Sequence, residues 1–148
     1  MKVSEIMIAP VFSVLLDDTL REVEAIFECK KIHQLLVLEE GKLFGVLSEY
    51  DLLRAISPYV HAHIYTTRDL ATLNQRVHQV VTRNPVSLNH QATVHEAISL
   101  FNMLHVGCIP IIDSAEIPVG IVTPHDIICN FYKICAATAS EKESKACR

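Results

Sequence analysis

The chain contains one pattern twice, as Gly45-Val46-Leu47-Ser48-Glu49-Tyr50-Asp51 and as Gly120-Ile121-Val122-Thr123-Pro124-His125-Asp126. Both stretches read Gly-x-x-[Ser/Thr]-x-x-Asp and begin inside an apolar run. The hydroxyl residue stands where a helix N-cap belongs, and the aspartate falls in the first helical turn, where the helix dipole favours a carboxylate. Each stretch therefore predicts the junction of a strand with a helix.

The rest of the chain repeats at nearly the same spacing. A shift of 74 residues superimposes identical residues, and one insertion near Pro118 raises the shift to 75 for the two motifs. The matched pairs are Val3 with Val77, Ser13 with Ser87, Thr19 with Thr93, Glu22 with Glu96 and Phe27 with Phe101. We therefore expect two copies of one supersecondary unit.

Each half shows the same order of predicted elements. A short apolar turn and a strand precede a helix that starts on a capping box, Thr19-Leu20-Arg21-Glu22 or Thr93-Val94-His95-Glu96. Two short apolar strands and a last helix complete the half. The strands are predicted at 12–15, 35–38 and 43–47 in the first half and at 86–88, 108–112 and 119–122 in the second.

This order divides the chain into four segments. The first repeat spans residues 1–57, a connector with a helical end spans 58–76, and the second repeat spans 77–135. The C-terminal tail, 136–148, loses the apolar pattern, which predicts mobility. The fold class is therefore α/β (α+β), with a β-α-β-β-α unit given twice.

Composition excludes several classes of protein. With 13 Lys plus Arg against 17 Asp plus Glu, the net charge is −4, so we expect no nucleic-acid partner. No apolar stretch reaches the length of a membrane span, and the N-terminus lacks the order of a signal peptide. Five cysteines without paired spacing argue against disulfides and zinc. We expect a cytoplasmic protein without membrane insertion.

The repeated motif allows two interpretations. Ser-x-x-Asp and Thr-x-x-Asp are ordinary helix starts, and capping alone explains either copy. A strand-to-helix junction also presents free backbone amides and a hydroxyl, which suit a phosphate. The carboxylate would repel a phosphate but accepts well from a vicinal diol, so the set of groups is typical of a ribose-phosphate site.

Both halves resemble the CBS (cystathionine β-synthase) domain, and the tandem resembles a Bateman module. The resemblance rests on the element order, on both motifs, on Thr82-Arg83-Asn84-Pro85-Val86 and on Ile109-Pro110-Ile111-Ile112-Asp113. It implies two repeats packed with pseudo-twofold symmetry. It also implies adenosine-containing ligands in two clefts: AMP, ADP or ATP, or else S-adenosylmethionine or NADH.

The resemblance implies that each cleft combines the aspartate motif of one repeat with residues of the other. In the first cleft, Ser48 and Asp51 would join Thr82, Val86, Val106 and Gly107. In the second, Thr123 and Asp126 would join Ile8, Phe12, Ile32 and His33. The aspartate would hold ribose hydroxyls, the hydroxyl residue would help to hold phosphate, and apolar residues would sandwich the adenine.

The two clefts are not expected to be equivalent. Val86 and Gly107 are small, whereas Phe12 and His33 at the matching positions could fill the adenine slot. Leu36 also replaces the proline that the second repeat keeps as Pro110. We therefore expect the first cleft to bind nucleotide more tightly.

Histidines and cysteines give no sign of catalysis or of a metal site. His61-x-His63 is the close histidine pair, and it lies in the connector without a matched carboxylate or cysteine. Cys29, Cys108 and Cys129 lie within apolar runs and are expected in the core. No nucleophile has a general base placed beside it, so we expect neither an enzyme nor a required cofactor.

The sequence thus favours a regulatory module that senses adenosine nucleotides and signals to a separate protein by changing shape. The alternative is a scaffold or dimerisation protein of the same fold without ligand. Half of the residues are hydrophobic, and several helix positions are more apolar than one buried face needs. These residues predict a helix-mediated homodimer: Ile26, Phe27, Leu100, Phe101, Leu104, Ile127, Ile128 and Phe131.

Overall fold

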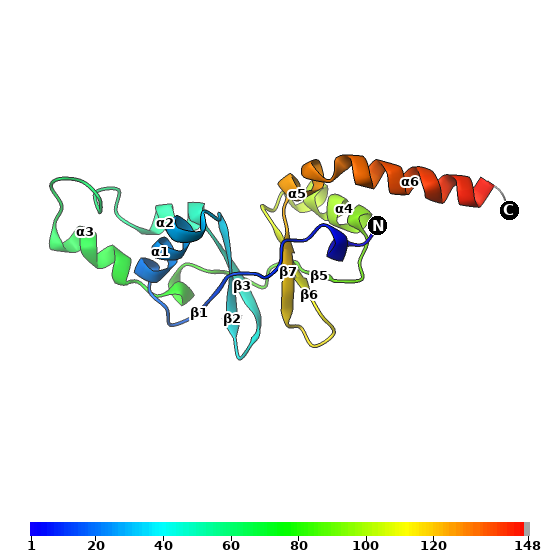
Figure 1. Ribbon diagram of the computed structural model, residues 1–148. Helices are drawn as coiled ribbons and strands as arrows, with labels where there is room; N and C mark the ends of the chain where they lie inside the picture. The colour runs from blue at the N-terminus through cyan, green and yellow to red at the C-terminus, as the bar shows by residue number, and fades with distance from the viewer. Residues whose placement is uncertain (147–148) are drawn as a thin grey trace. The chain divides into compact units, whose positions relative to one another are not determined.

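The computed structural model describes residues 1–146. The chain forms two compact units, one from Phe12–Pro85 and one from Met1–Val11 together with the chain from Val86 onward. Figure 1 labels the elements of each unit. Both units combine a small sheet with helices, so the mixed α/β class expected from the sequence is confirmed.

The unit Phe12–Pro85 holds a four-stranded sheet in the order β1-β2-β3-β4. Strand β1 pairs in parallel with β2, while β2–β3 and β3–β4 are antiparallel. The strands are β1 (Ser13–Leu15), β2 (Gln34–Glu39), β3 (Lys42–Ser48) and β4 (Thr82–Arg83). The helices are α1 (Leu20–Lys30), α2 (Glu49–Ala55) and α3 (Thr67–Ala71), with single 3₁₀ turns η2 (Thr72–Asn74) and η3 (Val77–Gln79).

The core of this unit lies between α1 and the sheet. Leu20, Val23 and Phe27 follow one another at helical spacing on one face of α1, and all three are buried. They pack in one cluster with strand residues such as Leu35 and Leu47. Phe27 is therefore a core residue, and its predicted place on a surplus helix face is wrong.

The second unit holds a three-stranded sheet in the order β5-β6-β7. Its strands are β5 (Leu88–Asn89), β6 (Ile109–Ile112) and β7 (Pro118–Val122). Its helices are α4 (Val94–Leu104), α5 (Pro124–Cys129) and α6 (Phe131–Ala146), preceded by the 3₁₀ turn η1 (Val3–Glu5). Buried residues of the opening turn, of α4 and of the strands share one core cluster.

Both predicted capping boxes are present at the first helix of each half. The Glu22 carboxylate accepts from the Thr19 amide at 2.6 Å, and Glu96 accepts from Thr93 at 2.6 Å. These backbone hydrogen bonds are the main cause of a lowered pKa for both glutamates, because they stabilise the ionised form. Each helix then ends on a left-handed residue at equivalent positions.

The opening segment of each repeat joins the unit that holds the other repeat. The Val3 amide donates to the Ala92 carbonyl at 2.9 Å, and the Val77 amide donates to the Asp18 carbonyl at 2.9 Å. Val3 and Val77 are both fully buried there. The compact units therefore consist of one repeat body plus the opening turn of the other repeat.

Helix α6 runs through the segment for which the sequence predicts a mobile tail, as far as Ala146. Residues 147–148 of that predicted tail lie outside the described residues. Among the described residues, no helix combines the length and the apolar character needed to cross a membrane.

Candidate functional site

The first motif forms a complete capping box between β3 and α2. The Ser48 hydroxyl accepts from the Asp51 amide at 3.0 Å. The Ser48 amide and hydroxyl both donate to Asp51 Oδ2, at 2.9 and 2.7 Å. Asp51 Oδ1 accepts no hydrogen bond from the described residues. Ser48 and Asp51 therefore cap α2, as the first interpretation of the motif expects, and Asp51 Oδ1 remains available to a ligand.

The second motif repeats this geometry between β7 and α5. The Thr123 amide and hydroxyl both donate to Asp126 Oδ2 at 2.7 Å. Pro124 occupies the first helical position, where its missing N–H matters least. Asp126 is 8% exposed, and its Oδ1 accepts no hydrogen bond from the described residues. The two aspartates thus present the same unused acceptor at equivalent positions.

The expectation of free backbone amides at these junctions is wrong in part. The Glu49 amide donates to the His33 carbonyl at 3.0 Å, and the Asp51 amide is taken by the Ser48 hydroxyl. In the second motif Pro124 has no N–H, and the Asp126 amide donates to Thr123. The carboxylate and the hydroxyl are therefore the main candidate ligand groups of each junction.

The motif glycines are needed because another segment passes close to each of them. A Cβ on Gly45 would stand 2.6 Å from the Thr82 carbonyl oxygen of β4. A Cβ on Gly120 would stand 2.8 Å from Cγ of Met7. The glycine at the first motif position therefore lets the opening segment of the other repeat lie against the strand.

These same segments carry two of the predicted ligand residues. Thr82 pairs with Val46 in the β3–β4 register, two residues before Ser48. Ile8 forms an antiparallel bridge with Ile121, two residues before Thr123. The structure thus brings Thr82 beside the first motif and Ile8 beside the second, at equivalent places in the two units.

The remaining predicted residues lie in the unit that does not contain the motif they would serve. Phe12, Ile32 and His33 belong to the unit Phe12–Pro85, and Val86, Val106 and Gly107 belong to the other. Phe12, Val86 and Gly107 are exposed, and His33 Nδ1 contacts Glu49 Oε2 at 2.6 Å. Their joining with the motifs into two clefts stays a prediction.

Two sequence expectations about reactive side chains need correction. His61 has a matched carboxylate, because its Nε2 lies 2.7 Å from Glu24 Oε1, which comes from α1. Cys108 is buried as expected, whereas Cys29 and Cys129 are exposed. Cys29 follows the buried Phe27 by two helical positions and so points away from the core. The His61 contact joins residues 37 apart, and no local pattern signals it.

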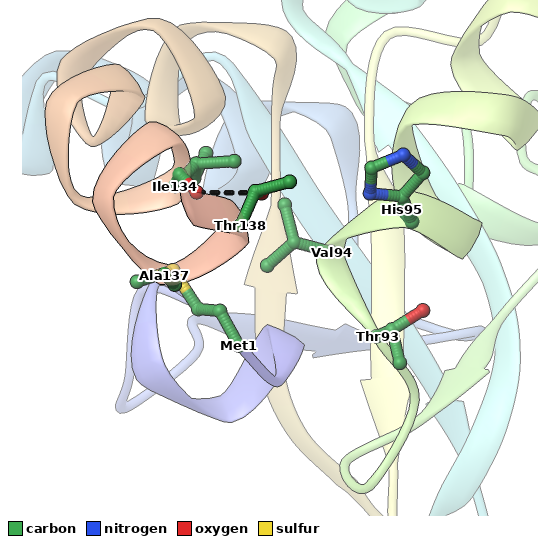
Figure 2. Close-up of a pocket in the computed structure, with 7 residues that line it drawn as sticks. All are labelled: Met1, Thr93, Val94, His95, Ile134, Ala137 and Thr138. Atoms are coloured by element: carbon green, nitrogen blue, oxygen red, sulfur yellow. Dashed lines mark hydrogen bonds between the residues drawn. The ribbon is translucent and has the colours of Figure 1, made fainter. Parts of the chain in front are cut away.

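A separate pocket of about 180 Å³ lies in the second unit, away from the motif residues. Figure 2 shows its walls: Met1, the N-cap Thr93 with the first residues of α4, and the first turns of α6. The Thr138 hydroxyl donates to the Ile134 carbonyl at 2.9 Å, so its hydrogen-bond donor is used within α6. No predicted ligand residue lines this pocket.

Comparison with known proteins identifies the family of this chain. The family model described as CBS domain matches residues 3–58 and 77–132. A CBS domain-containing protein of Dictyostelium discoideum is 28% identical over 134 residues, which cover 89% of this chain and 92% of that protein. The chain spans between 16% and 38% of the length of four further relatives from Methanocaldococcus jannaschii and Methanosarcina acetivorans.

Solved structures share the fold. The CBS domain pair of protein MJ0100, in complex with 5′-methylthioadenosine and S-adenosyl-L-methionine, has a TM-score of 0.73 and 22% identity, covering 90% of this chain and 97% of that one. CBSX2 in complex with AMP has a TM-score of 0.72 and 20% identity, covering 90% and 97%. Because the family model matches both repeats and the fold is that of CBS domain pairs, the chain belongs to the CBS domain family, as a tandem pair or Bateman module.

Proposed function

We propose that this protein is a regulatory module that binds adenosine-containing nucleotides in clefts between its two CBS repeats. The observation that carries the proposal is the duplicated aspartate, Asp51 and Asp126, each with one carboxylate oxygen engaged in the cap and the other accepting no hydrogen bond from the described residues. We further propose that binding changes the shape of the module and is read by a separate protein. On this proposal the chain is a sensor and not an enzyme.

The geometry suits a ribose better than a bare anion. A carboxylate whose Oδ2 is held by two donors has a fixed orientation, so its Oδ1 is a preorganised acceptor for a diol. The Ser48 hydroxyl already donates to Asp51, so toward a ligand it can act chiefly as an acceptor or reorient. Ribose recognition therefore falls to Asp51 and Asp126, and we assign phosphate contacts a lesser part.

Ligand-bound relatives support the adenosine class. The MJ0100 domain pair is in complex with S-adenosyl-L-methionine and 5′-methylthioadenosine, and CBSX2 is in complex with AMP. These three ligands share adenine and ribose and differ in the group attached to the 5′ carbon. We propose AMP, ADP or ATP as the ligand of this chain, with S-adenosylmethionine or NADH as further members of the class to test.

We propose that the cleft built on Asp51 binds more tightly than the cleft built on Asp126. Phe12, assigned to the second cleft, carries a bulky ring that is 40% exposed, and Lys30 Nζ lies 5.3 Å from the ring centroid. Val86, assigned to the first cleft, is smaller and 39% exposed. A bulky ring and a neighbouring cation leave less room for adenine.

The test is nucleotide titration of the full chain with Asp51→Ala and Asp126→Ala, read by calorimetry and by thermal unfolding. A ligand that binds only the folded state at 100 times its Kd stabilises it by about 2.7 kcal/mol. We expect AMP or ATP to stabilise the wild-type chain and Asp51→Ala to lose more affinity than Asp126→Ala. A larger loss in Asp126→Ala would reverse the assignment of the clefts.

Asp69→Ala is the matched control, because Asp69 caps α3 in the same way. The Thr66 amide and hydroxyl donate to its Oδ2 at 2.8 and 2.7 Å, but its Oδ1 is taken by the Ser57 hydroxyl at 2.6 Å. Asp69→Ala should destabilise the chain without weakening nucleotide binding. No stabilisation of the wild type by any adenosine ligand would favour the ligand-free scaffold instead.

We also propose that the module pairs through helix faces into a homodimer. Three of the residues predicted for that face are exposed: Leu104 at 43%, Ile128 at 70% and Phe131 at 58%. Covering apolar side chains of this size is favourable at about 25 cal/mol per Å². Light scattering at micromolar concentration should give the mass of two chains, and a monomeric mass would contradict the proposal.

A further inference from the structure

Three potential metal ligands meet on the surface of the unit Phe12–Pro85, outside the nucleotide motifs. Glu24 and Glu28 lie one turn apart on α1, and His61 reaches them from the connector. One ligand atom from each residue lies within 4.8 Å of the other two. His61 Nε2 and Glu24 Oε1 are 2.7 Å apart. Two structural elements therefore converge on one point with an imidazole and two carboxylates.

Packing of the surrounding residues holds His61 and Glu24 in place. Val60, directly before His61, is 6% exposed and belongs to the same core cluster as α1 residues Val23 and Phe27. The Glu24 side chain is 16% exposed, so it is largely packed, whereas His61 is 67% exposed. Burial of Val60 fixes the backbone position of His61, and packing fixes the Glu24 side chain. The exposed His61 ring leaves room for an ion and water.

The spacing fits a single ion. Zinc binds imidazole nitrogen and carboxylate oxygen at about 2.0 to 2.2 Å, so tetrahedral ligand atoms stand about 3.4 Å apart. The observed separations, 2.7 Å for the contacting pair and no more than 4.8 Å for any pair, bracket that value. His61 and Glu28 are the exposed members of the set, so rotation of these two side chains adjusts the separations around the packed Glu24.

We propose that Glu24, Glu28 and His61 bind a divalent cation of the zinc type and so fasten the connector to α1. One imidazole with two carboxylates suits Zn²⁺ or Co²⁺, and it lacks the thiolates that select Cu⁺. Mg²⁺ and Ca²⁺ prefer oxygen ligands and so do not account for the imidazole in the cluster. The proposal uses none of the residues assigned to nucleotide binding and goes beyond the proposed function.

The test is titration of the full-length protein with Co²⁺, followed by visible absorption, with Zn²⁺ added afterwards as competitor. We expect weak ligand-field bands that Zn²⁺ abolishes. Glu28→Gln and His61→Gln should each weaken Co²⁺ binding by at least about ten-fold. His63→Gln is the matched control, since it lies on the same connector outside the cluster, and it should bind like the wild type.

Absorption also separates this site from the exposed pair of Cys129 and His125, whose Sγ and Nε2 lie 3.3 Å apart. Cobalt bound there would show a thiolate charge-transfer band in the near ultraviolet, and Cys129→Ser would remove it. Binding that survives Glu28→Gln and His61→Gln, or that vanishes with Cys129→Ser, would overturn the proposal. So would the absence of any Co²⁺ binding at millimolar concentration.

Discussion

A methyl group added at Gly45 would strike the backbone of the neighbouring strand. Gly45 pairs with Arg83 of β4, and a Cβ there would stand 2.6 Å from the Thr82 carbonyl oxygen. Ordinary contact begins near 3.4 Å, so β4 would have to retreat by about 0.8 Å. A backbone carbonyl cannot rotate aside as a side chain can, so the retreat disturbs the pairing itself.

The expected loss of stability has two sources. Overpacking a well-packed site costs about 1–3 kcal/mol. The displacement of β4 also weakens the short β3–β4 pairing, in which each hydrogen bond contributes about 0.5–1.5 kcal/mol. Gly45→Ala should therefore lower the free energy of unfolding by about 2–4 kcal/mol. Gly120→Ala meets the flexible side chain of Met7 instead, and about 1 kcal/mol is expected because a thioether adapts.

The assay is urea unfolding of the wild type and both variants, with Gly41→Ala as a control. Gly41 has a φ of +79°, and no atom of the described residues lies within 4 Å of an added Cβ, so its replacement reports left-handed strain alone, about 1–2 kcal/mol. Gly45→Ala should be the least stable of the three. If its loss does not exceed that of Gly120→Ala, the argument from a rigid β4 backbone is refuted.

Two further predictions concern ionisable groups. Burial raises the pKa of the Cys108 thiol to about 12, so it should resist alkylation at pH 8 in the folded protein, as peptide mass spectrometry would show; labelling as fast as that of the exposed cysteines would contradict this. Hydrogen bonds from Ser57 and then Thr66 lower the pKa of Asp69 below its ordinary value of 3.8. This stabilisation is complete above about pH 4 and is lost as the pH falls through the lowered pKa. Unfolding midpoints of Asp69→Asn should therefore fall less steeply in acid than those of the wild type, and parallel slopes would count against the assignment.

The four helices that follow Thr19, Ser48, Thr93 and Thr123 could be predicted because the determinants of their caps are local, whereas α6 was not predicted. The two capping boxes on Thr19 and Thr93 and the two on Ser48 and Thr123 join residues three apart, so the sequence already contains both partners. The hairpin strands were equally visible as paired apolar runs. The duplicated aspartates followed from the same spacing, whereas the adenosine class of ligand that we propose came from the resemblance to the CBS domain.

Strand β4 and the Ile8 bridge escaped prediction for the opposite reason. Each consists of one or two paired residues, and each partner lies far away in the chain, at Val46 for Thr82 and at Ile121 for Ile8. Such short segments carry no periodicity of their own. The use of the Glu49 amide by the His33 carbonyl was hidden in the same way, and it changes which groups a ligand can meet.

The sequence by itself determined that this protein has two repeats, and that a capped helix with an aspartate in its first turn follows the last strand of each repeat. Only the tertiary structure decided that each repeat takes its opening turn from the other, and that His61 meets Glu24 across 37 residues. The physical reason is the range of the interactions. The partners of a helix cap lie within one helical turn of each other. The opening turn of each repeat, by contrast, is positioned by the burial of Val3 or Val77 against residues that are distant in the sequence.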